Sequence, residues 1–513
     1  MIIFYHNKYT ITEIVSTETG NFSNQINRNI VTALFDFATK FKDEILVWCH
    51  ESEKDNLNVT EIQHLFHHKK FLFSYNSSNY FDNQLGYIED SLYIKINKEV
   101  NYATWQMSSR VGAIHAMVLN ACKDDLKAEN NFDYFLNSFA KRAMANGLFC
   151  YSQPKLLIHK SALNEVPQSN LYELFKFTKQ HYKARWIFLL FFNLMLFEKK
   201  FPVLPFLNSL FYKRRKINLE VLNQIPLESN KKLVEHGTLD VLIPTIGRKE
   251  YLLNVLNNLA AQTYLPQNVI IIEQNPEDNS QSNLDFIQNQ KWPFVVKHHF
   301  THQAGACNAR NIGLSLIESE FTFMADDDIV FENNLLEEAI KTFKQTGNEV
   351  FLVACHLKSQ TIVPQLPLQF PVFGAGHAFV KSSCIKKLKF TMGFEFGFGE
   401  DADFGMQLRN KGFDVLYIST QTILHLKAPM GGFRTKPILK WQNDAITPKP
   451  SPTVMLYRLL YDTKEQTRNY KSTLFIKNLN SNFFLNPFKY VKTFKQKWNR
   501  SVYWANVLNK QQS

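Results

Sequence analysis

The sequence predicts an α/β protein with a mixed sheet in its second half, and three stretches carry this prediction. Residues 239–275 alternate a short apolar run, a loop, a stretch of helical periodicity and a second apolar run. Residues 321–325 are apolar and stop at three consecutive aspartates, and a helical pattern at 400–409 precedes an apolar run at 415–418. Such alternation predicts βαβ units, whose right-handed crossovers place the loops after parallel strands at one sheet edge.

The length and composition limit the class of protein. A chain of 513 residues with 45% hydrophobic content is enough for about two to four domains with their own cores. The net charge of +12 and the pI near 9.1 favour polyanionic partners, namely nucleotides, nucleic acid or an anionic membrane surface. The six cysteines form no CxxC pair, which indicates a reducing compartment and argues against a disulfide framework or a structural zinc site.

One strongly apolar segment, residues 186–197, has basic residues on both sides. A bilayer span needs about 20 residues, so this shorter segment is predicted to be a buried or inter-domain helix, or a helix that lies in the membrane interface. The N-terminus has no basic stretch followed by a long apolar one, so no signal peptide is expected.

Four regions follow from these patterns. Residues 1–160 are predicted to form an α/β domain, and residues 161–235 a helical connector that is apolar and basic. Residues 236–434 carry the strand and helix pattern described above. The tail, residues 435–513, combines basic and aromatic residues, which predicts a membrane-surface helix, a nucleic-acid contact, or helices packed on the preceding domain with a solvated basic face.

Within the first region, the pattern predicts a helix at 31–41 and strands at 44–48, 71–75 and 91–96. A further helix and strand are expected between Asn131 and Ile158.

The three aspartates at 326–328 are the feature around which the second half is organised. Adjacent carboxylates repel one another and cannot be buried without a compensating partner. At the carboxyl end of a parallel strand, where open α/β sheets bind ligands, a divalent cation that carries a phosphate would be that partner. A solvated acidic turn is the alternative.

Other charged residues occupy comparable positions. Arg310 lies in a small-residue stretch that opens a helix, where it could reach a phosphate, brace the acidic cluster or be an ordinary surface arginine. Glu400 and Asp401 begin a later helix, a place where the helix dipole stabilises negative charge and where capping residues are also common. His425 follows the strand after that helix.

Together these stretches resemble a known family. The segments VLIPTIGR, IIIEQN, GACNARNIGL, ADDD and GFGEDADFGMQLRNKG, with a trailing histidine, are similar in order and spacing to inverting family 2 glycosyltransferases of the GT-A fold. The resemblance covers about residues 239–434 and implies a GT-A catalytic domain with a Rossmann-like mixed sheet. No GxGxxG follows the first strand, so a dinucleotide fingerprint is absent.

The resemblance implies donor-binding roles for several matching residues. Pro244, Thr245, Arg248 and Glu273 would line the site of the nucleotide base and ribose. The family more often has aspartate at the position of Glu273. Arg310 would lie beside the diphosphate.

The resemblance also implies a metal site and a catalytic pair. Asp326 and Asp328 would fill the DxD positions on either side of Asp327, one contacting the ribose and the other the metal, Mn²⁺ or Mg²⁺. His425 fits an occasional third metal ligand of the family, or it is a structural histidine. Asp401 would be the general base, and Glu400 would help to hold the acceptor.

The function implied is an inverting transfer from a nucleotide-diphospho-sugar to a glycan or lipid-linked acceptor, in cell-surface polysaccharide synthesis. The expected location is the cytoplasm, including peripheral contact with the inner face of the cell membrane. No nucleic-acid partner is expected. One alternative is a sugar-phosphate nucleotidyltransferase, although PTIGRKE is a poor match to its Gly-rich basic phosphate loop. The other is a non-catalytic glycan-binding or scaffold protein with GT-like folds, against which the intact acidic motifs argue.

The first region repeats part of the second-half pattern. Residues 131–159 and 400–425 each have an acidic start, a helix that carries an arginine (Arg142 or Arg409), a glycine, a strand and a histidine. The strand at 44–48, however, is followed by CHESE and no DxD. We therefore expect either a degenerate GT-A-like domain that has lost metal and donor binding, or a coincidental helix–strand pattern.

Overall fold

The protein is described here from a computed structural model, which covers residues 1–18, 20–22, 26–75, 80–126, 129–161, 168–217, 220–428, 438–479 and 486–510. The chain forms two compact units, Met1–Asn230 with Asp462–Thr473, and Lys231–Tyr461 with Leu474–Ser513. Residues 161–230 of the predicted connector therefore cluster with the first unit, and the predicted tail contributes residues to both.

The second unit is built on a mixed sheet, nine-stranded in the described part of the chain, in the order β11-β10-β9-β12-β16-β14-β17-β13, with β15 paired to β17. The strands β11, β10, β9 and β12 run parallel, β16 is antiparallel to β12 and β14, and β14 is parallel to β17. The bounds are β9 Leu239–Thr245, β10 Asn268–Gln274, β11 Val295–Thr301, β12 Phe321–Ala325, β13 Ile329–Phe331, β14 Val350–His356, β15 Leu368–Gln369, β16 His377–Lys381 and β17 Leu416–His425.

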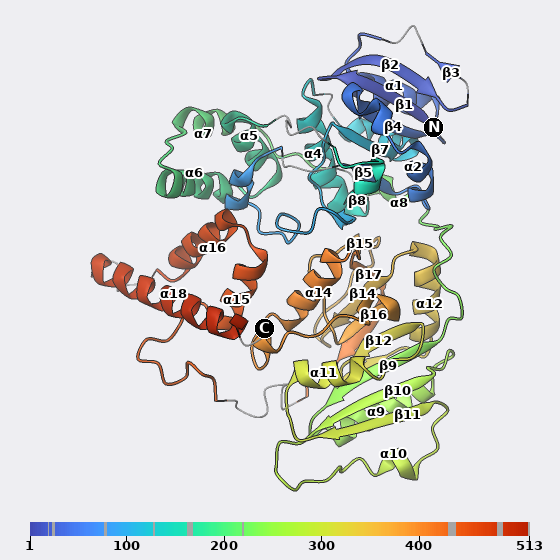
Figure 1. Cartoon of the computed structure of the whole chain (residues 1–513), viewed down its shortest axis with the longest axis vertical. Helices are drawn as coiled ribbons and strands as arrows, with labels where there is room; N and C mark the ends of the chain where they lie inside the picture. Colours follow the sequence, from blue (N-terminus) through green and yellow to red (C-terminus); the bar gives the residue numbers. More distant parts are fainter. Residues whose placement is uncertain are drawn as a thin grey trace. The chain divides into compact units, whose positions relative to one another are not determined.

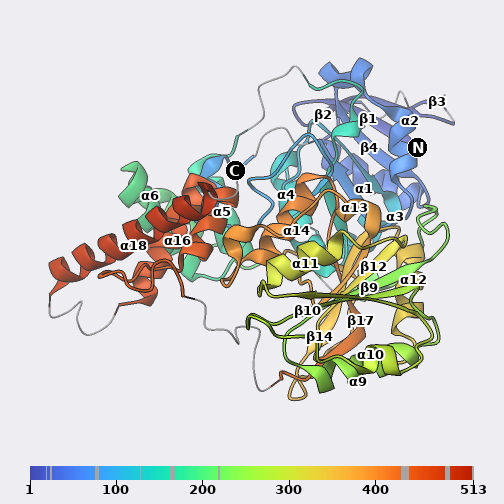
Figure 2. The same ribbon diagram turned by 60° about the horizontal axis from the view of Figure 1, so that its bottom comes forward.

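Helices cover both faces of this sheet. Figure 2 shows α11 and α14 on one face and α9 on the other. Helices α15 and α18 pack against each other elsewhere in the unit. The bounds are α9 Lys249–Ala260, α10 Phe286–Asn289, α11 Ala306–Leu314, α12 Leu335–Thr346, α13 Ser382–Ile385, α14 Glu400–Asn410, α15 Pro452–Tyr461 and α18 Pro487–Lys510.

A buried carboxylate fixes the parallel pair β9 and β12. Asp240, on β9, accepts hydrogen bonds from the backbone N–H groups of Glu318 and Ser319, at 2.8 and 3.0 Å, and from the Ser319 hydroxyl at 2.6 Å. These residues lie just before β12, so the bonds hold the start of β12 beside β9. The register places Met324 opposite Leu242, and both strands therefore end at the same edge of the sheet.

The first unit also contains a mixed sheet, eight-stranded over the residues described, in the order β3-β2-β1-β4-β7-β5-β8-β6. The bounds are β1 Ile2–Asn7, β2 Thr10–Ser16, β3 Gly20–Asn21, β4 Ile45–His50, β5 Phe71–Ser74, β6 Tyr102–Ala103, β7 Val111–His115 and β8 Phe149–Ser152. The helices, labelled in Figure 1, are α1 Ile30–Lys40, α2 Val59–Leu65, α3 Ala116–Ala121, α4 Phe132–Ala143, α5 Leu171–His181, α6 Arg185–Glu198, α7 Val203–Ser209, α8 Glu220–Asn223 and most of α16 Lys464–Lys477.

The two sheets share a central topology. In the first unit the path β1-β4-β7-β5-β8 is parallel, antiparallel, antiparallel and parallel. The path β9-β12-β16-β14-β17 in the second unit has the same directions and the same order along the chain. Helix α4 precedes β8 as α14 precedes β17. The two sheets thus share a strand order, in addition to the helix–strand pattern noted in the sequence.

One expectation about the first unit is corrected, and another is met in part. Residues 91–96 form turns and no strand. Tyr93 and Ile94 are buried there by packing, without pairing in the sheet. The apolar segment 186–197 is a helix, α6, but only part of it is buried, and Phe188, Phe192 and Leu196 are exposed. Among the described residues, no helix is long and apolar enough to cross a membrane.

Candidate active site

A recess of about 300 Å³ lies in the second unit, where β9 and β12 end and α11 and α14 begin. Strands that end at one sheet edge bring the loops after them together, which is why residues far apart in sequence meet here. Most of the residues predicted from the sequence line it: Pro244, Thr245, Arg248, Arg310, Asp326, Asp327, Asp328, Glu400 and His425.

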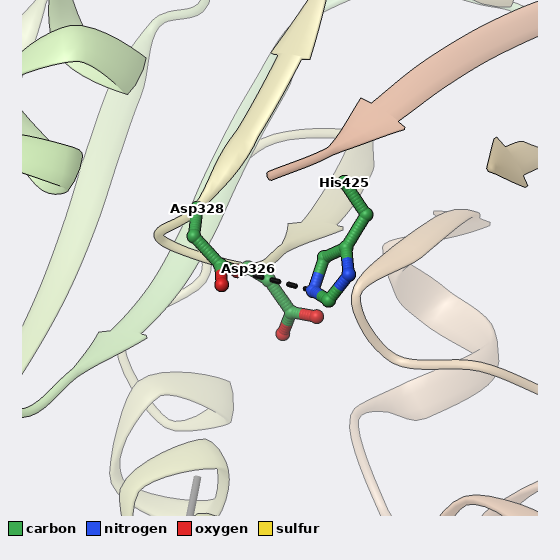
Figure 3. Close-up of side chains that lie close together, drawn as sticks. All are labelled: Asp326, Asp328 and His425. Atoms are coloured by element: carbon green, nitrogen blue, oxygen red, sulfur yellow. Dashed lines mark ion pairs between the residues drawn. The ribbon is translucent and has the colours of Figure 1, made fainter. Parts of the chain in front are cut away.

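Asp326, Asp328 and His425 form a cluster of possible metal ligands. One ligand atom from each residue lies within 4.8 Å of the others. Figure 3 shows the two carboxylates and the imidazole directed toward a common space. The register of β13 and β17 places Ile329 opposite His425, which brings the histidine next to the aspartates. Of the residues that the structure describes, only these three form such a cluster.

The donor set fits a divalent cation. Asp328 is buried and accepts a hydrogen bond from the backbone N–H of Ala428 at 3.0 Å on Oδ2. Its other oxygen, Oδ1, has no hydrogen bond and lies 3.3 Å from His425 Nε2. A buried carboxylate oxygen without a donor is costly unless a charge compensates it. Two carboxylates and an imidazole are ligand types that Mn²⁺ accepts, and Mg²⁺ prefers the oxygens.

Asp327 lies in the turn between β12 and β13, and its side chain is buried. The Thr245 hydroxyl donates to Asp327 Oδ2 at 2.7 Å, and Arg248 Nη1 donates to Oδ1 at 2.5 Å. Burial raises the pKa of Asp327 to about 6, against the lowering effect of Arg248 and Thr245. Arg248 Nη1 also lies 3.1 Å from Asp328 Oδ2. This arginine therefore joins the loop after β9 to the aspartates after β12.

A glycine leaves room for Asp326. A Cβ atom at Gly376, just before β16, would lie 2.1 Å from Asp326 Oδ2. Any larger residue would push that carboxylate out of its position. The small-residue turn at 373–377 is therefore part of the site, since it sets where Asp326 can point.

Arg310 connects the aspartates to the start of α14. It is buried, and its Nη2 lies 3.5 Å from Asp326 Oδ1 while its Nη1 lies 3.8 Å from Asp401 Oδ1. Its guanidinium also lies over the Phe390 ring at 5.3 Å. Burial raises the pKa of Asp401, and Arg310 partly opposes this; burial and the Asp401 charge raise the pKa of Glu400.

Two of the predicted site residues, Asp401 and Glu273, are not among those that line the recess. Asp401 directly follows Glu400 on α14, whereas Glu273 lies on a strand, outside the lining. It is buried on β10, where it accepts a hydrogen bond from Asn283 N–H at 3.3 Å and its Oε2 lies 2.9 Å from His298 Nε2. Burial alone would raise the pKa of Glu273, but the hydrogen bonds from His298, Ser282 and Asn283 outweigh it and lower the pKa. The neighbouring Gln274 lines the recess instead.

Sequence reasoning missed two further charged residues of the recess. Glu395 accepts hydrogen bonds from the N–H groups of Cys307 and Asn308 at the start of α11, at 3.1 and 2.9 Å. Lys427 also lines the recess and has a positive φ of 54°, a conformation that non-glycine residues rarely adopt. Neither residue lies in a pattern with a chemical meaning, although Glu395 falls inside the GFEFGFGED stretch.

In the first unit, the acid at the position of Asp401 is engaged in hydrogen bonds within the fold. Asp133 is the second residue of α4, as Asp401 is of α14. Asp133 is buried and accepts three hydrogen bonds, from the Ser109 N–H and hydroxyl at 2.8 Å each and from the Tyr9 hydroxyl at 3.0 Å. This carboxylate is occupied by hydrogen bonds within the fold.

Comparison with known proteins finds a family match for part of the second unit. Residues 240–399 match the model of "Glycosyl transferase family 2". The chain is also 24% identical over 114 residues to "Glycosyltransferase GlyG" of Streptococcus pneumoniae serotype 4 (strain ATCC BAA-334 / TIGR4). That match covers 22% of this chain and only 38% of the length of the pneumococcal protein.

Two solved structures show partial similarity. S. aureus TarS 1-349 in complex with UDP aligns over 51% of this chain and 80% of its own, with 15% identity and a TM-score of 0.34. GalNAc-T7 with UDP, GalNAc and Mn2+ aligns over 53% of this chain and 59% of its own, with 11% identity and a TM-score of 0.36. Both TM-scores lie below 0.5, so neither similarity carries a further conclusion about this chain.

Proposed function

We propose, from the premise that residues 240–399 belong to glycosyl transferase family 2, that the chain transfers a sugar from a nucleotide-diphospho-sugar to an acceptor hydroxyl with inversion at the anomeric carbon. The observation that carries the proposal is the position of Arg310. It lies within 4 Å of both Asp326, in the cluster of possible metal ligands, and Asp401, at the start of α14. One sugar could therefore contact both groups.

In the proposed mechanism, Asp401 is the general base. Its carboxylate takes the proton of the acceptor hydroxyl while the oxygen forms a bond to the anomeric carbon. On the opposite side of that carbon the bond to the diphosphate breaks, and the diphosphate leaves with the electron pair. A single in-line displacement inverts the configuration, so no second carboxylate nucleophile is needed. The raised pKa of Asp401 suits a base, since a higher pKa makes a carboxylate a better proton acceptor.

The leaving diphosphate needs positive charge. Arg310, Arg248 and Lys427 line the recess and are the side chains of this chain that would supply it. Asp326, Asp328 and His425 would hold the divalent cation, Mn²⁺ or Mg²⁺. When bound, such an ion neutralises negative charge on the leaving group and orients the donor.

Three finer assignments remain proposals: the donor is a nucleotide-diphospho-sugar, the acceptor is a glycan or lipid-linked glycan of the cell surface, and the chain acts at the inner face of the membrane. The basic, aromatic helix α18 supports the last, because Phe488 and Val491 are exposed among its lysines.

The first test measures donor binding and donor hydrolysis. Thermal unfolding with a panel of nucleotide sugars, with and without Mn²⁺, identifies the donor, because a specific ligand stabilises the folded state by mass action. A glycan-binding scaffold would neither bind a nucleotide sugar nor release its nucleoside diphosphate. Binding without Mn²⁺ that equals binding with Mn²⁺ would contradict the metal assignment.

The second test is Asp401→Asn, which keeps the shape of the side chain and removes its basicity. Loss of a positioned base costs about 10²–10⁴-fold in rate, while donor binding is expected to stay at the wild-type level. Glu337→Gln is the matched control, since Glu337 is an exposed acid on α12. Transfer by Asp401→Asn near the wild-type rate would remove Asp401 from this role.

A further inference from the structure

The helices α6 and α7 of the first unit turn their apolar side chains outward. On α6, Phe188, Phe192 and Leu196 are exposed, and their spacing of four residues places them on one side of the helix. On α7 and the turn after it, the exposed residues follow a similar spacing: Val203, Leu204, Leu207, Leu210 and Phe211. Phe211 is 87% exposed and Leu204 67%, values that are unusual for side chains of this size.

The polar and apolar residues of α6 are placed opposite to those of a helix whose outer side faces water. Asn193, the one polar residue between Trp186 and Phe197, is fully buried, and its Nδ2 donates to Asn469 Oδ1 at 3.0 Å. Its neighbour Phe192 is exposed. A helix that faces water would place the amide outward and the phenylalanine inward, so the apolar side of α6 is built for a non-aqueous contact.

The two helices are held together as one element. The Phe206 ring of α7 contacts Phe188 and Phe191 of α6 at 5.3 Å each, and Phe175 of α5 at 6.3 Å. Helices α5, α6 and α7 lie together in Figure 1, where α6 and α7 are drawn in green. The exposed side chains therefore belong to a formed surface of paired helices.

Basic residues surround this surface. Residues 183–216 contain eight Lys or Arg and one acidic residue, Glu198. Glu198 pairs with Lys200, and Arg215 pairs with Glu129. Lys183, Arg185, Lys199, Lys213 and Arg214 are exposed and form no ion pair within the part of the chain that the structure describes. In the chain they lie at or near the ends of the two helices, within a few residues of the exposed apolar side chains.

We propose that α6, α7 and the turn after them, residues 185–211, dock on an anionic lipid bilayer, with the apolar side chains in the interface and the lysines and arginines at the phosphates. The charge complementarity selects this occupant, because a basic rim around an apolar face matches a surface of acidic headgroups over acyl chains. The element lies in the interface and does not cross it, since α6 has only 14 residues. The inference rests on the membrane contact proposed above and adds to α18 a second contact surface, on the first unit, and its test does not depend on catalysis.

The experiment is sedimentation of the full-length protein with vesicles. Binding is expected to vesicles of equal parts phosphatidylglycerol and phosphatidylcholine, to fall with added salt, and to be much weaker with phosphatidylcholine alone. The variant Leu204→Asp/Leu207→Asp should lose binding by about tenfold or more, since two apolar contacts are replaced by charges of the wrong sign. Lys213→Gln and Arg214→Gln should each weaken binding by about fivefold.

Two further variants, each at an exposed apolar position outside α6 and α7, serve as comparisons. Val363→Asp, at an exposed apolar position of the second unit, should bind vesicles as the wild type does. All variants should unfold at the wild-type temperature, because each side chain is exposed. If Phe488→Asp on α18 abolished binding while Leu204→Asp/Leu207→Asp did not, the proposal would be overturned. It would also be overturned if light scattering showed a lipid-free dimer that Leu204→Asp/Leu207→Asp converts to a monomer.

Discussion

Arg310 Nη1 lies 3.8 Å from Asp401 Oδ1, and this contact joins the proposed base to the side of the recess that carries the aspartates. The same guanidinium lies 3.5 Å from Asp326 through Nη2. Burial lowers the pKa of Arg310, but Asp401 and Asp326 raise it above its usual range, so the residue stays charged. A permanent positive charge at this place stabilises the ionised form of Asp401 and therefore sets the pH at which the base becomes available.

The first prediction concerns the pH dependence of transfer. Burial raises the pKa of Asp401, so the acid limb of kcat/KM should lie above the usual aspartate pKa of about 3.9. Because Arg310 lowers that pKa, Arg310→Gln should move the limb to higher pH, in addition to weakening donor binding. The measurement is the pH profile of kcat/KM for both proteins. Lys341→Gln, which removes an exposed cation on α12, is the control and should leave the limb in place. A limb that stayed fixed or moved to lower pH in Arg310→Gln would contradict this role.

The second prediction concerns the metal ligands. Asp328→Asn should weaken Mn²⁺ binding more than His425→Gln does, because Asp328 is buried and supplies a charged oxygen whereas the imidazole is neutral when it coordinates. Titration of Mn²⁺ followed by electron paramagnetic resonance of the free ion measures both affinities. His356→Gln is the control, since His356 Nδ1 is within 3.1 Å of the Leu357 carbonyl and lies outside the cluster. Equal Mn²⁺ affinity in wild type and Asp328→Asn would exclude this cluster as the metal site.

The third prediction separates the effect of Gly376 on the rate of transfer from its effect on the free energy of unfolding. A Cβ there would lie 2.1 Å from Asp326 Oδ2, and the half-exposed Asp326 side chain can rotate away from it. Gly376→Ala should therefore change the free energy of unfolding by only about 1 kcal/mol or less. Displacement of the carboxylate by an ångström should still lower transfer by about 10²-fold. Chemical denaturation and initial rates measure the two effects. A large loss of stability with unchanged Mn²⁺ affinity would show that Gly376 serves the fold and not the site.

The sequence predicted a site residue best where the end of a single strand or helix fixes the position of that residue. The apolar run at 321–325 and the aspartates after it predict both β12 and the place of Asp326 and Asp328, because a strand end fixes which residues reach the sheet edge. The pairing of β13 with β17, which brings His425 to Asp328, depends on a register between residues about a hundred positions apart. A family resemblance indicated that histidine, whereas periodicity alone did not.

Other parts of the site were beyond sequence reasoning for a physical reason. Glu395 caps α11 from 88 positions away in the chain, and no local pattern encodes such a contact. The length and apolar character of residues 186–197 predicted a helix, but which side of α6 is covered depends on Asn469, far along the chain. The apolar residues Tyr93 and Ile94 led to the wrong prediction of a strand. They are buried by packing in a region of turns, and an apolar pattern does not distinguish this from burial in a sheet.

The last prediction concerns the stability of the first unit in acid. His6, on β1, is fully buried, and its Nε2 lies 2.8 Å from the Ser109 carbonyl oxygen. Burial lowers the pKa of His6 to about 4, below the value of about 6.5 in the unfolded chain. The folded state therefore binds fewer protons than the unfolded state between these values, and its stability is full above pH 6.5 and lost as the pH falls toward 4. The loss from His6 amounts to about 3 kcal/mol.

Amide hydrogen exchange in β1 and β4, measured between pH 7 and 4.5 and corrected for the intrinsic exchange rate, reports this loss in the unit that contains His6. His115, whose pKa burial also lowers to about 4, adds to the same slope, so His6→Gln should reduce the pH dependence without abolishing it. His64→Gln, on the exposed side of α2, should keep the wild-type slope. If His6→Gln kept that slope too, the acid sensitivity would have to come from other groups, and His6 would be a packing residue only.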